Sequence, residues 1–265
     1  MIRACAILLA LAPLFAETNA ERGKRVIAEA LAAVGGDQFL HMQDRVEEGR
    51  AYSFYRERLS GLAHAKIYTR YLIRPEPSVP GQVQVRERQA FGGKRGENAI
   101  LFIDGQGYDI TFRGARILTD EVLERYKETT LRNIFYILRQ RLGEPELTFT
   151  SRGAAVLDNQ SVEIVEIADA ANRVVTVSFS TVTKLPVRQS TFRRDRVTNL
   201  KVEEVTLFSK YRDVGQGVMW PYDIQRQRDG EKIFEIFSES VTINQDLKDD
   251  LFTLPANLKI LKPMK

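Results

Sequence analysis

The chain has 265 residues, of which 43% are hydrophobic and 28% charged, and its formal net charge is +4. This balance excludes a disordered chain, a collagen-like chain and a polytopic membrane protein. With 1 cysteine and 2 histidines, disulfide frameworks and Cys/His zinc sites are disfavoured, and we expect no metal and no cofactor. The small net charge on a surface of both signs also argues against nucleic acid as a partner.

The beginning of the chain has the pattern of an export signal. A short cationic start precedes an apolar run, residues 4–14, that is too short to span a bilayer. We predict a signal peptide over residues 1–20, cleaved after Ala20, with Ala16 as the alternative position. Cys5 does not follow a completed apolar stretch, so no lipid anchor is expected. The sequence therefore predicts an exported, soluble protein.

Residues 21–34 are predicted to form a helix. Apolar side chains at Val26, Ile27 and Ala30 recur with the spacing of one helical face, and the glycine pair 35–36 ends the pattern. A helix with one apolar face must cover a larger apolar surface elsewhere in the chain.

The period of the hydrophobic pattern changes to two after Gly49, which predicts strands. Residues 64–73 alternate in this way, and the pattern resumes over 83–91. The proline-rich stretch 75–81 separates the two runs, because proline cannot donate a hydrogen bond to a sheet. We interpret it as an exposed hairpin connection. A second, tighter hairpin is predicted around 105–107, where Gly-Gln-Gly separates two short apolar runs.

The strongest helical pattern begins at Thr119 or Asp120 and continues to the glycine at position 143. Its apolar side chains recur along one side, at Leu131, Ile134, Phe135, Leu138 and Leu142. We therefore expect one continuous second helix of about six turns.

Strand patterns separated by short turns occupy most of the remaining chain. They cover residues 146–151, 161–168, 173–180, 185–193, 201–213, 218–227 and 231–243. Short turns imply antiparallel neighbours, and two long helices are too few to connect the strands of a parallel sheet. No change of composition marks a linker, so we predict a single domain over residues 21–265, built as a large antiparallel barrel or sandwich.

Several late strands read as apolar on both faces. In the last one, Ile233 and Phe237 alternate with Phe234 and Ile236. Either both faces are covered, or one is a concave apolar surface open to a ligand. A sheet of this width curls because its strands twist, and two helices would fill it only in part. The remaining cleft would suit acyl chains.

Five segments spread along the chain resemble a known family. They are 32–36 (AAVGG), 102–108 (FIDGQGY), 183–188 (TKLPVR), 218–222 (VMWPY) and 243–255, which ends in LFTLP. In this order, and with the export signal, they resemble the LolA/LolB-like periplasmic lipoprotein-carrier superfamily, in particular its outer membrane lipoprotein-sorting protein relatives. The resemblance implies an α+β fold: an unclosed antiparallel β half-barrel of about 11–12 strands with two main helices plugging the concave face.

The same resemblance implies an apolar cavity for lipid acyl chains. Our leading hypothesis is non-enzymatic periplasmic binding of lipid acyl chains or lipoprotein, for envelope transport or maintenance. A monomer with a membrane-associated donor or acceptor protein is expected. The first alternative is an envelope sensor or scaffold that binds a protein partner through the same fold. The second, the least supported, is a carboxylate-based hydrolase, and no catalytic residue is predicted.

Candidate site residues come from the apolar strand faces and the second helix. The predicted cavity lining is Ile67, Tyr71, Val85, Phe102, Phe135, Leu138, Val177, Phe179, Leu207, Trp220 and Tyr222. The basic segment Arg193, Arg194 and Arg196 is the predicted contact for an anionic headgroup or a partner. The pattern by itself does not separate cavity from core, because a one-residue error in register turns a side chain to the other face.

Overall fold

The computed structural model describes residues 17–73, 79–93, 96–195, 198–255 and 258–261. Most of the predicted signal peptide, residues 1–16, and part of the proline-rich connection lie outside them. The helical elements are α1 (Asn19–Ala33), α2 (Gly36–His41), α3 (Asp120–Arg132), α4 (Ile134–Tyr136), the π-helical turn η1 (Ile137–Arg141) and the 3₁₀ turn η2 (Asp249–Phe252).

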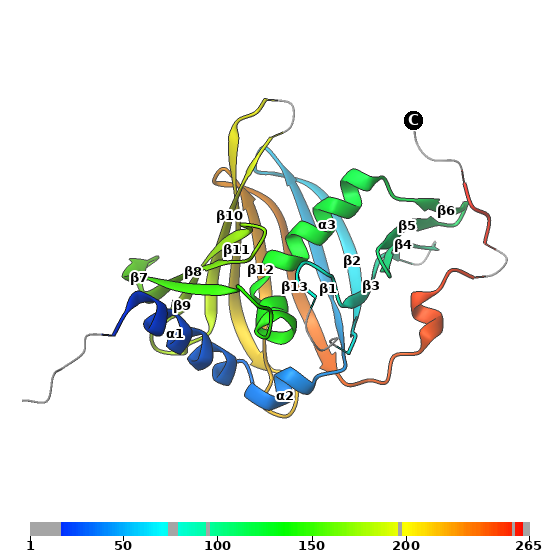
Figure 1. The fold of residues 1–265 in the computed structure, drawn as a ribbon. Helices are drawn as coiled ribbons and strands as arrows, with labels where there is room; N and C mark the ends of the chain where they lie inside the picture. Colours follow the sequence, from blue (N-terminus) through cyan, green and yellow to red (C-terminus); the bar gives the residue numbers. More distant parts are fainter. Residues whose placement is uncertain (1–16, 74–78, 94–95, 196–197, 256–257, 262–265) are drawn as a thin grey trace, which may run out of the picture.

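The described residues form one antiparallel sheet of thirteen strands (Figure 1). The strands are β1 (Asp44–Tyr55), β2 (Arg58–Tyr71), β3 (Val85–Gly93), β4 (Gly96–Ile103), β5 (Gln106–Thr111), β6 (Gly114–Ile117), β7 (Thr148–Leu157), β8 (Gln160–Ala168), β9 (Val174–Ser180), β10 (Pro186–Arg194), β11 (Lys201–Asp213), β12 (Met219–Arg228) and β13 (Glu231–Ile243). Their spatial order is β6-β5-β4-β3-β2-β1-β13-β12-β11-β10-β9-β8-β7.

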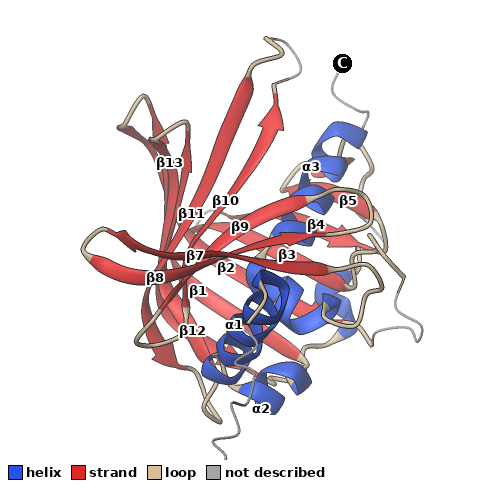
Figure 2. Ribbon diagram, turned by 60° about the vertical axis from the view of Figure 1, so that its left-hand side comes forward, coloured by secondary structure: helices blue, strands red, loops and turns tan. Residues whose placement is uncertain are grey.

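The sheet does not close, since β6 and β7 remain its two edges. Every neighbouring pair is joined along the chain except β1 and β13, which bring the early and late strands together. The sheet curves, and α1, α2 and α3 lie on its concave side (Figure 2). The predicted unclosed half-barrel with helices is confirmed, and the strand number is thirteen rather than 11–12.

Helix α1 packs on β7 and β8 and begins at Asn19, two residues before the predicted start. Thr18 explains this start: its Oγ1 accepts a hydrogen bond from the backbone N–H of Glu21 at 3.2 Å, and the Glu21 carboxylate accepts from the backbone N–H of Thr18 at 2.8 Å. This reciprocal capping box satisfies donors that the first helical turn leaves unpaired. Val26, Ile27 and other residues of one face are buried.

The second predicted helix is interrupted at Asn133, so the expectation of one continuous helix is wrong. The backbone of Asn133 is extended (φ −70°, ψ 126°), and its Oδ1 accepts from the N–H groups of Phe135 and Tyr136 at 2.9 and 3.2 Å. An asparagine side chain that caps the following turn competes with the helix before it. The apolar spacing continues across the break, which is why periodicity did not reveal it.

A bulge in β13 explains part of its apolar pattern, whereas Phe237, which precedes the bulge, lies on the other face against Tyr52. Glu48 pairs with Ser240 and Gly49 with Ser238, so Glu239 is an extra residue. Side chains alternate along a strand, and one inserted residue exchanges the faces beyond it. Ile236 before the bulge and Val241 after it therefore both face the concave side.

In the described part of the chain, no helix has the length and apolar character needed to cross a membrane.

Candidate functional site

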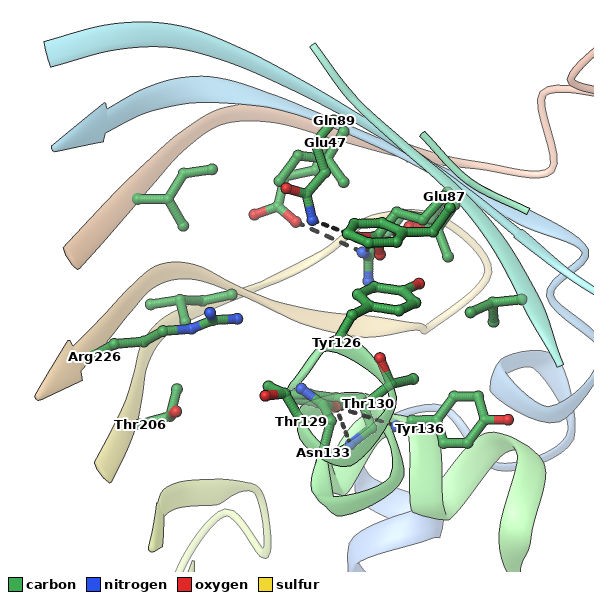
Figure 3. Close-up of a pocket in the computed structure, with 18 of the residues that line it drawn as sticks. Glu47, Glu87, Gln89, Tyr126, Thr129, Thr130, Asn133, Tyr136, Thr206 and Arg226 are labelled. Carbon is green, nitrogen blue, oxygen red and sulfur yellow. Dashed lines mark hydrogen bonds and ion pairs between the residues drawn. The ribbon is translucent and has the colours of Figure 1, made fainter. Parts of the chain in front are cut away.

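A cavity of about 410 Å³ lies between α3 and the concave face of the sheet (Figure 3). Side chains of β1–β4 and β10–β13 line it, together with residues of α3 and α4. Its volume falls within the roughly 300–1,000 Å³ of typical small-molecule sites.

Six of the eleven predicted lining residues face this cavity: Ile67, Tyr71, Val85, Phe102, Phe135 and Trp220. Four others belong to the packed core instead: Leu138, Val177, Phe179 and Tyr222. Leu138 belongs to η1 itself, and the other three are covered because buried side chains of α1, α2 and η1 pack against them. Whether the six bind a ligand remains a prediction.

Leu207 points away from the cavity. Its neighbours Thr206 and Phe208 both line the cavity, and side chains alternate along β11. The prediction therefore chose the wrong face of this strand by one residue.

One end of the cavity is aromatic. The ring of Phe135 lies 4.6 Å from that of Trp220 and 5.2 Å from that of Phe208, measured between centroids. On the opposite wall, Phe102 of β4 and Tyr126 of α3 stack with centroids 3.6 Å apart and planes inclined by 2°. Both groups of rings offer apolar surface suited to hydrocarbon. We call the first group, Phe135, Phe208 and Trp220, the aromatic floor of the cavity.

The cavity wall also carries a charged pair that sequence patterns did not reveal. Arg45 Nη2 lies 3.8 Å from Glu47 Oε2 and donates to Thr69 Oγ1 at 3.2 Å, and Ser238 Oγ donates to Glu47 Oε1 at 2.5 Å. The Arg45 guanidinium also lies 3.8 Å from the centre of the Trp220 ring. The charges of Arg45 and Glu47 therefore largely neutralise each other.

Glu87 and Arg226 face the cavity from opposite parts of the sheet (Figure 3). Burial raises the pKa of the Glu87 carboxyl, although Gln89 Nε2 donates to it at 2.5 Å. Burial lowers the pKa of Arg226, and the negative charge of Glu87 opposes that shift. The Arg226 side chain is nevertheless solvent-exposed, and it lines the cavity.

These polar residues were missed because only apolar residues were selected from the sequence as cavity lining. Alternation along one strand already places Thr69 on the face of Ile67, whereas Arg45 and Glu47 join that face only through the pairing of β1 with β2.

Three hairpin tips lie at one end of the sheet, as strand register shows: β1–β2, β10–β11 and β12–β13. Large apolar side chains are exposed on the first two: Tyr55, Leu59, Leu62, Phe192 and Leu200. We call these three tips the hairpin rim.

The predicted basic contact lies on this rim. Arg193 Nε donates to Glu204 Oε1 at 2.7 Å, and Arg194 Nη1 donates to the Asn199 carbonyl at 3.3 Å. Arg196 lies outside the described residues. The structure thus places two of the three arginines at the tip and gives each an internal partner.

No group of three His, Cys, Asp or Glu side chains suited to a metal ion occurs among the described residues.

Comparison with solved structures identifies the fold. A DUF1329 family protein from Desulfovibrio piger matches 87% of this chain and 97% of its own, with a TM-score of 0.59 and 13% identity. A candidate outer membrane lipoprotein-sorting protein domain from Vibrio parahaemolyticus matches 88% and 97%, with a TM-score of 0.56 and 11% identity. A LolA superfamily protein from Nitrosomonas europaea matches 87% and 97%, with a TM-score of 0.52 and 9% identity.

No family model matches the sequence, and neither does any curated protein. The three solved structures nevertheless confirm, at the level of the fold, the resemblance predicted from the five segments.

Proposed function

We propose that the cavity binds the acyl chain of a lipid or lipoprotein, and that the protein is a non-enzymatic periplasmic carrier acting in envelope transport or maintenance. The observation that carries this proposal is the partly apolar space of about 410 Å³ left between α3 and the concave sheet. Each methylene moved from water into it would contribute about 0.8 kcal/mol. The folds of the three solved structures are compatible with this use.

Binding of a fluorescent long-chain acyl probe, together with native mass spectrometry of the purified protein, tests the proposal. Ile67→Trp places a larger ring in the cavity and is expected to weaken probe binding at least tenfold. Val156→Trp, at an exposed position, serves as the matched control and should bind like the wild type. Absence of both co-purified lipid and probe binding would exclude a carrier.

We further propose that the hairpin rim meets the membrane that donates or accepts the lipid. Exposed Tyr55, Leu59 and Phe192 stand beside Arg58 and Arg194, a combination suited to an anionic interface. This assignment is preferred over the sensor or scaffold alternative because the rim combines apolar tips with basic residues.

Flotation with vesicles that contain anionic lipid tests the rim. The double variant Leu59→Ser with Phe192→Ser should reduce association several-fold, whereas Val182→Ser, exposed at the opposite end of the sheet, should not. Stoichiometric capture of an envelope protein through the rim, without vesicle binding, would favour the scaffold instead.

One observation favours the hydrolase as a second candidate: Glu47 and Glu87 line the same cavity, and the pKa of Glu87 is raised. Each carboxylate accepts one hydrogen bond from a neighbouring side chain, and since a carboxylate has about four acceptor sites, these bonds orient the two groups without occupying them. Steady-state turnover of a chromogenic long-chain ester that disappears in both Glu47→Gln and Glu87→Gln would support hydrolysis. Its absence would leave the binding function alone.

Export remains part of the proposal, and the start of α1 bears on the processing site. Cleavage after Ala20 would remove Thr18 and with it the capping box, whereas cleavage after Ala16 would keep both. Loss of such a cap costs about 1 kcal/mol. We therefore favour cleavage after Ala16 over the position after Ala20 that the sequence pattern suggested. Amino-terminal sequencing of the protein recovered from the periplasm would distinguish the two cleavage positions.

A further inference from the structure

The lining of the cavity carries more cationic than anionic side chains. The described lining contains the cations Arg45, Arg125 and Arg226 and the anions Glu47 and Glu87. Arg45 and Glu47 form a pair, and Glu87 accepts from Gln89. An excess of positive charge is left facing the space.

Arg226 is the member of this set that lies on the sheet and has no polar partner. Among the described residues it makes no hydrogen bond or ion pair, and its guanidinium lies 5.8 Å from the centre of the Phe234 ring. The Arg226 side chain is solvent-exposed, so the guanidinium is open to an anionic group that approaches from the hairpin rim, and a charge-assisted hydrogen bond to such a group would be strong. Figure 3 shows the side chain directed from β12 into the cavity, toward the side occupied by Tyr126.

Along β12, the unpaired charge of the cavity lies nearer the hairpin rim than the apolar side chains do, and the charged pair at the other end, Arg45 with Glu47 beside Trp220, is internally neutralised. Arg226 lies near the hairpin rim, and Ile224 and Trp220 follow toward the aromatic floor. Six residues of strand span about 20 Å. This order matches an amphiphile with its head near the rim and its chain against the floor.

From these placements we infer that the cavity takes a single-chain amphiphile with an anionic head, a long-chain carboxylate or a lysophospholipid phosphate, and that Arg226 binds that head. The inference rests on the proposed lipid-binding function and specifies its ligand. Thr206, directly opposite Arg226 on β11, provides a hydroxyl on the same side. The modest volume favours one chain over several.

Titrations that displace the fluorescent acyl probe test the inference with three compounds. They are hexadecanoate, hexadecanol, which has the chain without the charge, and acetate, which has the charge without the chain. A single-chain lysophosphatidate distinguishes a phosphate head from a carboxylate. We expect the wild type to bind hexadecanoate or the lysophosphatidate at least tenfold more tightly than hexadecanol, and acetate not measurably.

Arg226→Gln should remove this preference by weakening hexadecanoate binding at least tenfold more than hexadecanol binding, and Arg226→Lys should restore part of it. Arg50→Gln is the matched control, because Arg50 pairs with Glu239 and lies on the outer face of β1. Circular dichroism melting verifies that each variant is folded.

Equal affinity of the wild type for charged and uncharged chains would overturn the inference and leave the acyl-binding function intact. A preference that survives in Arg226→Gln would overturn the role of Arg226. Failure of every chain to bind would overturn the proposed function itself.

Discussion

At the scale of single residues, the strongest electrostatic feature is a buried ionic network behind the helices. Arg141 donates to the carboxylates of Glu144 and Asp169, each at 2.7 Å, and to the Leu131 carbonyl. The three charged side chains are 2–4% exposed. Burial by itself would raise the pKa of Asp169, but hydrogen bonds from Arg141 and Arg173 overcome this and lower it. The network joins α3, η1 and the β8–β9 turn.

Arg141→Met should lower the free energy of unfolding by about 3–5 kcal/mol, because it leaves two buried carboxylates without their cation. Urea denaturation measures this change. Arg152→Met is the control, since the ion pair of Arg152 with Glu166 is exposed and such pairs contribute about 0–1 kcal/mol. A similar decrease in the free energy of unfolding for both variants would contradict the claim that burial makes the Arg141 network more stabilising than an exposed ion pair.

Because its pKa is raised, Glu87 should make the stability of the fold change with pH in the opposite direction from a salt-bridged carboxylate, whose pKa is lowered. The folded-state pKa of Glu87 is raised above the ordinary 4.5, so the folded protein keeps the proton to higher pH than the unfolded chain. Stability is therefore lost as pH rises from 4.5 toward the folded pKa. Glu87→Gln, which mimics the protonated acid, should be more stable than the wild type at neutral pH.

Thermal melts across this pH range measure the effect of Glu87→Gln. The advantage of the variant should shrink as pH falls to 4.5 and disappear below it. A difference between the two proteins that stays constant with pH would contradict the raised pKa.

At the scale of elements, the contact between α1 and β7 depends on one glycine. A Cβ at Gly23 would lie 2.5 Å from the Phe149 carbonyl oxygen and 3.1 Å from the Ser151 nitrogen. Both are backbone atoms of β7 that cannot turn aside. The absence of a side chain therefore lets the helix approach the edge strand and cover it.

Gly23→Ala should lower the free energy of unfolding by about 1–3 kcal/mol through overpacking, although alanine favours helix by about 1 kcal/mol. Gly143→Ala is the matched control, because nothing lies within 4 Å of a Cβ at Gly143. Chemical denaturation of both variants measures the difference. A stabilised Gly23→Ala would show that the helix is free to shift outward.

At the scale of the whole molecule, the two long helices are held very differently. Helix α1 buries Gly23, Val26, Ile27 and Ala30, whereas Leu131 is the buried residue of α3. Helix α3 lies across the cavity, with Tyr126 stacked on Phe102 as its main contact there. An element with little buried surface opens at low cost in free energy. The C-terminal part of α3 is held by the Glu128–Arg173 ion pair and by the Arg141 contact with Leu131, so the part of α3 that precedes Glu128 is the segment through which the cavity would admit a ligand.

Hydrogen exchange followed by mass spectrometry should show the α3 amides that precede Glu128 exchanging at least tenfold faster than those of α1. Addition of hexadecanoate should slow this segment and leave α1 unchanged, because ligand contacts would hold the segment over the cavity. Equal protection of the segment and α1 without ligand would contradict a mobile segment.

Local patterns predicted most of the elements. Alternation identified β8–β13 closely, and helical spacing with a glycine stop identified α1. The strand predicted over 146–151 ended six residues before β7 does, because the register of β7 shifts between Ser151 and Gly153 and interrupts the alternation. The short β6 and α2 were missed, because four to six residues carry too little periodicity. The break at Asn133 was missed because apolar spacing persisted through it.

By itself, the sequence determined the antiparallel class, the paucity of catalytic groups and six of the cavity-facing residues, since each follows from composition or from alternation along one strand. Only the tertiary structure decided that Glu47, Glu87 and Arg226 share a cavity, and that Val177 and Phe179 are covered. The reason is physical: a strand's period specifies two faces, but the bulge at Glu239 and the positions of α1 and α3 decide which face is inward and which part of it stays open.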